Sequence, residues 1–107
     1  MNIQFEYLFR DAGNYKTFGE VVFTNQHNLA IAFVITTIEK GLIEGRWFDP
    51  DRWQIPRFGF HKVNAFGLDG FLWYEFDAIL TTKVKPNQTK DVAEWLSIIS
   101  SLPQPRF

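Results

Sequence analysis

The sequence predicts a single α+β domain over residues 1–107, in which a largely antiparallel sheet of four to five strands carries two helices on one face. Three observations predict this class. Residues 2–24 alternate apolar and polar side chains around a central turn, which is typical of a β-hairpin. Residues 29–42 and 92–102 repeat apolar side chains at helical spacing. Residues 71–80 alternate again, so the expected order is two strands, a helix, two or three strands, and a helix.

The hairpin is predicted from a strand over residues 2–10, the turn Asp11-Ala12-Gly13-Asn14, and a second strand from about Lys16 to Thr24. Glycine and asparagine accept the positive φ angles that tight turns need. Residues 25–28 then offer polar side chains that could cap a helix, and Lys40-Gly41 is a typical helix end. This helix is apolar on more than one stripe, which implies that it contacts something on two sides.

The middle of the chain is harder to interpret. Pro56 excludes a regular helix there, and we expect short extended pieces at residues 46–48 and 57–62. The long strand over residues 71–80 follows a loop, and alternation predicts an inward face made of alternate residues. These are Leu72, Tyr74, Phe76, Ala78 and Leu80. In the last helix Thr89 is a candidate cap, and Asp91 is expected in the first turn.

Composition excludes several classes of function. The chain has no cysteine, and hence no disulfide framework, zinc–thiolate site or cysteine nucleophile, and we expect no metal and no cofactor. Its net charge is −1 without a basic block, so no nucleic-acid partner is expected. No apolar run approaches the roughly 20 residues that cross a bilayer, and the start lacks the order of a secretory signal. A cytoplasmic protein is the expectation.

One set of residues could carry catalysis. His61 would face Glu75 and Asp77 if its segment pairs with the long strand, and these two carboxylates have Cα atoms about 6.5–7 Å apart on one strand face. A histidine with two carboxylates can move a proton or bind a divalent metal. The competing interpretation is that Glu75 and Asp77 belong to the solvated face of an antiparallel sheet. No metal-ligand spacing supports the catalytic interpretation, which remains the alternative.

The hairpin turn is a second candidate site. It gathers polar side chains that could hold an anion or a partner's backbone, namely Arg10, Asp11, Asn14 and Lys16. Such residues also commonly just build the turn. The stretch FEYLFRDAGNYK at residues 5–16, with GEVVF at 19–23, resembles the start of a group of small bacterial proteins of unknown function. The resemblance implies a bacterial, cytoplasmic origin and no particular chemistry.

The aromatic content points to a third possibility, which we favour. Twelve Phe, four Trp and three Tyr make up 18% of the chain, more flat apolar surface than a small core readily absorbs. Tryptophan and arginine, both enriched at interface centres, interleave in the middle of the chain. The residues are Arg46, Trp47, Arg52, Trp53 and Arg57. They predict a protein-interaction module that binds a partner protein or itself as a homo-oligomer. A satellite core under a long loop would explain the same cluster.

Overall fold

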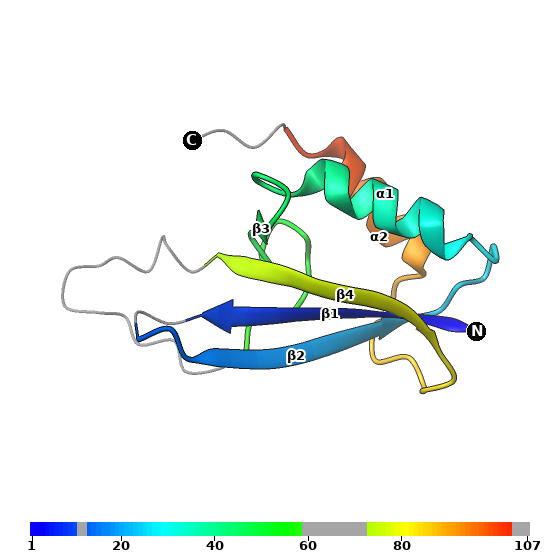
Figure 1. Ribbon diagram of the computed structural model, residues 1–107. Helices are drawn as coiled ribbons and strands as arrows, with labels where there is room; N and C mark the ends of the chain where they lie inside the picture. The colour runs from blue at the N-terminus through cyan, green and yellow to red at the C-terminus, as the bar shows by residue number, and fades with distance from the viewer. Residues whose placement is uncertain (11–12, 59–72, 104–107) are drawn as a thin grey trace.

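Four antiparallel strands form one curled sheet in the computed structural model, and two helices lie together on one face of it (Figure 1). The structure describes residues 1–10, 13–58 and 73–103. The predicted α+β class and order of elements are confirmed. No helix within these ranges is long and apolar enough to cross a bilayer. The elements are β1 (Asn2–Arg10), β2 (Lys16–Phe23), α1 (Ile31–Gly41), β3 (Trp47–Phe48), β4 (Tyr74–Thr82) and α2 (Val92–Ser101).

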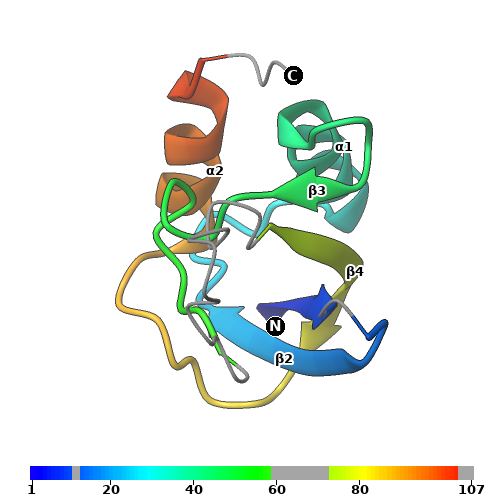
Figure 2. The same cartoon turned by 90° about the vertical axis from the view of Figure 1, so that its left-hand side faces the viewer.

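The sheet has the strand order β2-β1-β4-β3, and every neighbouring pair is antiparallel. β1 and β2 pair without a break from Ile3 opposite Phe23 to Arg10 opposite Lys16, which is the predicted hairpin. β2 and β3 form the two edges. Figure 2 shows that the sheet curls, so that β3 rises beside α1 while β2 remains at the far side from it.

A bulge interrupts the pairing of β1 with β4. Glu6 lies opposite Ala78, whereas the next residue of β1, Tyr7, lies opposite Phe76. Asp77 is therefore an extra residue on β4. A bulge of one residue shifts the side-chain alternation of its strand by one position.

Leu72 of the predicted inward face lies outside the described residues, and among the others the prediction is correct only before this bulge. Tyr74 and Phe76 face the core as expected, but beyond the bulge it is Ile79 that packs against the core. Ala78 lies on the opposite face, and Leu80 is 37% exposed. The prediction for these two residues was wrong, because a strict period of two contains no sign of an inserted residue.

Aromatic rings fill the space between the sheet and the helices. The ring centroid of Phe5 lies 5.0 Å from that of Trp95 and 5.5 Å from that of Phe48. Trp53 stacks on Phe48 at 4.5 Å, and its carbonyl oxygen accepts a hydrogen bond from the Trp95 indole at 2.8 Å. Few large aromatic side chains of the described residues are exposed. They are Tyr15, Phe18 and Phe33.

The start of α1 differs from the expected capped form. Its cap position is Ala30, which offers no side-chain hydrogen bond. Asn25 instead bonds to both the N–H and the C=O of Leu29, at 2.9 and 3.1 Å, and so fixes the turn before the helix. The helix ends at Gly41 with Lys40 in its last turn, as predicted.

The start of α2 is tied to the end of β2 through one carboxylate. Asp91 is itself the cap, and its Oδ2 accepts the N–H of Ala93 at 3.0 Å. Its Oδ1 accepts hydrogen bonds from the Thr24 hydroxyl and from the Gln26 N–H, both at 2.8 Å. The expected cap, Thr89, therefore lies before the helix, and Asp91 joins two segments far apart in sequence.

Residues 49–58 cross the inner face of the sheet beside the helices. The Arg57 guanidinium bonds to Asp49 at 2.9 Å and to Asp51 at 3.0 Å, which holds the two ends of this segment together. The hydroxyl of Tyr7 donates to the carbonyl of Pro56 at 2.7 Å. The segment is therefore anchored both to itself and to β1.

Phe58 ends this crossing against the sheet. The Tyr74 hydroxyl accepts the Phe58 N–H at 2.8 Å and donates to the Phe58 carbonyl. A Cβ atom at Gly19 would lie 2.5 Å from the Phe58 ring, so β2 needs a glycine at this point. Of the extended piece expected at 57–62, the first two residues lie in no strand, and the others lie outside the described residues.

Candidate functional site

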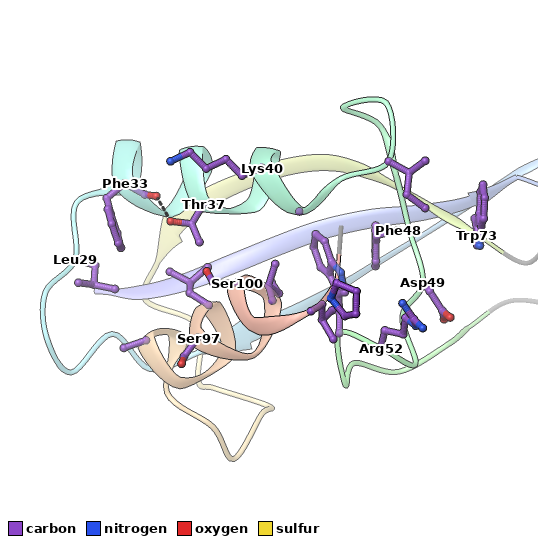
Figure 3. A pocket seen from close by; sticks show the side chains of 18 residues that line it. Leu29, Phe33, Thr37, Lys40, Phe48, Asp49, Arg52, Trp73, Ser97 and Ser100 are labelled. Carbon is purple, nitrogen blue, oxygen red and sulfur yellow. Dashed lines mark hydrogen bonds between the residues drawn. The ribbon is translucent and has the colours of Figure 1, made fainter. Parts of the chain in front are cut away.

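A groove of about 860 Å³ runs between α1 and α2 and ends against β3 and the turn at residues 49–53 (Figure 3). Its floor includes the buried side chains of Trp53, Leu96 and Ile99. Phe33 lies at the rim with 55% of its surface exposed. An apolar floor within an open cleft is the usual form of a ligand or peptide site.

The two apolar stripes of α1 explain one wall of this groove. Val34 and Ile38 are fully buried on the stripe that faces the core. Phe33 and Thr37, one turn apart, lie on the stripe that faces the groove, as Figure 3 shows. On the core side α1 packs against β4 and α2, whereas its other side lines an open groove, so the expected second contact of this helix stays a prediction.

Gly41 brings the helices together at the end of the groove near β3. A Cβ atom at this residue would lie 2.6 Å from Cγ2 of Ile99 and 3.3 Å from Cζ2 of Trp53. The last turn of α1 therefore touches α2 directly, while the open groove extends back along both helices to Leu29 and Phe33.

The charged side chains of the groove are mostly basic. Lys40 and Arg52 line it, and within the described ranges neither forms an ion pair. Asp49, the single carboxylate among the described residues that line the groove, already accepts a hydrogen bond from Arg57. The groove therefore offers two cations that have no carboxylate partner among the described residues, beside an apolar floor.

A second cluster lies on the opposite face of the sheet and is centred on Glu75. This carboxylate is only 6% exposed, and it accepts hydrogen bonds from Arg10 Nε at 2.7 Å and from Arg46 Nε at 2.9 Å. Hydrogen bonding to Arg10 lowers the pKa of Glu75, with a further contribution from Arg46, against the desolvation that would raise it. Glu75 is thus a fully engaged carboxylate and a weak proton acceptor.

No family model matches the chain, and the searches of curated proteins and of solved structures find no match either. The resemblance of the first 23 residues to small bacterial proteins stays a prediction.

The five residues of the predicted Trp/Arg cluster lie in different places. Trp53 is 3% exposed and belongs to the core, where only part of it reaches the groove. Arg57 is held by the two aspartates of its own segment. Arg46 stacks over the half-buried Trp47, with its Cζ 5.1 Å from the ring centroid, and Arg52 alone lies exposed on the groove. The role of these residues in binding stays a prediction.

The turn residues contribute to the second cluster. Arg10, which the sequence placed in an anion site, donates to Glu75 and also to Asn14 Oδ1 at 2.6 Å. Asn14 has a φ of 67°, the left-handed conformation expected in such a turn. Lys16 is exposed at the start of β2, and Asp11 lies outside the described residues.

Only two residues of the predicted catalytic set, Glu75 and Asp77, lie within the described ranges. Glu75 carries the two arginine contacts, and Asp77 lies exposed at the bulge. His61 lies outside the described residues. Within the described ranges, no three His, Asp or Glu side chains are grouped so that they could hold a metal ion.

Sequence reasoning missed Phe33 and Lys40 as site residues. Both lie on α1, one on its second apolar stripe and one in its last turn. The breadth of the apolar surface of this helix was the available signal. It indicated a second contact, but it did not show that this contact would be left open.

Proposed function

We propose that this protein is an interaction module that binds an amphipathic helical segment of a partner protein in the groove between α1 and α2. The open apolar groove carries this proposal. Phe33 supports it most directly, because an aromatic ring that is 55% exposed beside an apolar floor gains by being covered. Helix-in-groove recognition uses this arrangement of an apolar floor and a polar rim.

The charges define the chemistry of the partner. Lys40 and Arg52 lack carboxylate partners among the described residues, so both can attract a negative charge on the partner. Ser97 and Ser100 also line the groove, but their hydroxyl groups carry no charge. A bound segment would therefore present apolar side chains on one face and acidic side chains beside them. Opposite charges at the rim would select such a segment and would increase its rate of association.

The length of the groove sets the length of the segment. The wall formed by α1 has 11 residues, which corresponds to about 16 Å of helix. A partner helix of similar length places apolar side chains at positions i, i+4 and i+7 along one face. The sequence predicts a cytoplasmic protein. We therefore propose that the partner is cytoplasmic as well, because the two must share a compartment.

The experiment uses two helical peptides with the same apolar face, one with a glutamate-rich and one with a lysine-rich polar face. Binding is followed by NMR chemical-shift changes, with the indole signals of Trp53 and Trp73 as reporters in the groove. We expect the acidic peptide to bind and the basic peptide to bind at least about tenfold more weakly. The double variant Lys40→Glu/Arg52→Glu should reverse this preference.

Two aromatic variants provide the matched control. Phe33→Asp should abolish peptide binding, whereas Phe18→Asp, which changes an equally exposed phenylalanine on β2, should leave it unchanged. Equal binding of both peptides to every variant would overturn the proposal. Binding of a long-chain carboxylate such as dodecanoate, without binding of either peptide, would replace it with a small-molecule site.

A further inference from the structure

We propose a second interaction surface, separate from the groove: the first half of β2 pairs with β2 of a second copy of this chain to form a symmetric antiparallel dimer. The relevant residues are Lys16, Phe18 and Glu20. They lie on an edge strand of the sheet, and their side chains are on the face opposite the helices, because the alternate residues Gly19 and Val21 face the core. Phe18 is 60% exposed.

The direction of the backbone groups follows from Val22. Its N–H donates to Asn87 Oδ1 at 2.8 Å, and its C=O accepts the N–H of Asn87 at 3.0 Å. Both groups of Val22 therefore point away from β1. Because N–H and C=O groups alternate in direction along an antiparallel strand, those of Lys16, Phe18 and Glu20 point to the same edge.

The two halves of this edge differ. Residues 87 and 88 cover it at Val22 through two backbone–backbone hydrogen bonds and one from the Val22 N–H to the Asn87 side chain. From Lys16 to Glu20, no described residue bonds to the outward backbone groups. An uncovered edge of this kind is a template for another strand. The covered half also limits an incoming strand to the first part of β2.

Charge complementarity selects both the partner and the register. In an antiparallel pair centred on Phe18, Phe18 faces Phe18 of the second copy, and Lys16 faces the second copy's Glu20 on both sides of the centre. A centre at Lys16 or at Glu20 would place like charges opposite each other, which is unfavourable. The in-between registers place Phe18 opposite a charged residue.

This arrangement uses every outward group of the free half. About six backbone hydrogen bonds join the two strands, and two cross-strand ion pairs flank the paired phenylalanine rings. Charged residues on an edge normally discourage pairing. Here the two charges have opposite signs and lie at equal distances from Phe18, so they discourage other partners and favour a second copy.

Sedimentation velocity over a concentration series tests the inference on the full chain. We expect the mass to rise from 12.6 kDa toward twice that value. Lys16→Glu and Glu20→Lys, tested separately, should each weaken the dimer about tenfold or more, because each places two like-charge pairs across the interface. An equimolar mixture of these two variants should associate again, because every facing pair is then opposite in charge.

Two further variants separate this surface from the groove. Phe18→Asp should give a monomer with an unchanged circular dichroism spectrum, whereas Phe33→Asp should remain a dimer. A monomer at all concentrations would overturn the inference, and so would a dimer that withstands both charge variants. A dimer lost only in Phe33→Asp would place self-association in the groove and overturn it as well. Peptide binding in the groove is read separately, so either proposal can fail alone.

Discussion

Gly41 of α1 lies so close to Ile99 of α2 that a Cβ atom on the glycine would be 2.6 Å from the Cγ2 atom of the isoleucine. No ordinary side-chain contact is that short. The absence of a side chain at residue 41 therefore determines how closely the two helices approach, and this contact sets one end of the groove.

Gly41→Ala should destabilise the protein by about 1–2 kcal/mol, because overpacking outweighs the roughly 1 kcal/mol gain in helix propensity. Urea denaturation measures this change. The control is the same substitution in an Ile99→Ala background, where the clash is absent and alanine should be neutral or stabilising. A stabilising effect of Gly41→Ala in the wild-type background would contradict the close approach.

Glu75→Gln should cost about 1–3 kcal/mol at pH 7, because charge-assisted hydrogen bonds to two arginines are weakened. The pKa of Glu75 is lowered below its ordinary value of 4.5, mainly by Arg10. Its contribution is therefore present above pH 4.5 and is lost as the pH falls through the lower, folded-state pKa.

Urea denaturation of the wild type and of Glu75→Gln at pH 7, 5 and 3 should show their stabilities converging at the acidic end. Glu39→Gln is the matched control, since Glu39 is exposed on α1, outside both proposed interaction surfaces, and forms no ion pair among the described residues. It should change stability by less than about 0.5 kcal/mol. A constant difference across this pH range would contradict the role of the Glu75 charge.

Asp91→Ala should cost about 2–3 kcal/mol, because it removes the α2 cap and the link to Thr24 and Gln26 together. Asp91→Asn keeps acceptor capacity at one oxygen and should cost less. Desolvation would raise the pKa of Asp91, but the hydrogen bonds from Gln26, Thr24 and Ala93 hold it below its ordinary value of 3.8.

The stability that Asp91 contributes is therefore present above pH 3.8 and is lost below it. Hydrogen exchange of the backbone amides shows which segments lose this stability. In Asp91→Ala, protection should decrease in the first turn of α2 and at Gln26. Thr89→Ala is the control, because Thr89 lies before the helix and should change exchange little. Equal protection in Asp91→Ala and the wild type would contradict the linking role.

Tyr74→Phe should destabilise the protein by about 1–3 kcal/mol, because it leaves the N–H and C=O of Phe58 without their partner. Burial raises the pKa values of Tyr7 and Tyr74 above the ordinary value of 10. The folded state therefore favours the neutral phenols, and their contribution is present below pH 10 and is lost as the pH rises above it.

Urea denaturation at pH 8, 10 and 11 tests this alkaline effect. The wild type should lose stability more steeply above pH 10 than Tyr7→Phe, which has no ionisable group in that position. Identical slopes for the two proteins would show that Tyr7 keeps an ordinary pKa in the folded state.

The strands and helices were predictable because each depends on residues close in sequence. The alternation in residues 2–10 and the helical spacing in residues 92–102 express the periods of their backbones. The cluster around Glu75 was not predictable. Arg10 and Arg46 approach it from 65 and 29 residues away, and the sequence had assigned the three residues to three different sites.

By itself the sequence determined the α+β class, the hairpin, the two helices and the exclusion of cysteine chemistry, because periodicity and composition act locally. Only the tertiary structure decided that β4 changes face at Asp77, that Trp53 is buried, and that α1 leaves Phe33 beside an open groove. Each of these depends on which distant backbone lies opposite a residue. The packing of the whole core sets which backbone lies opposite. Aromatic rings from the four strands, from α2 and from the segment at residues 49–58 fill this core together.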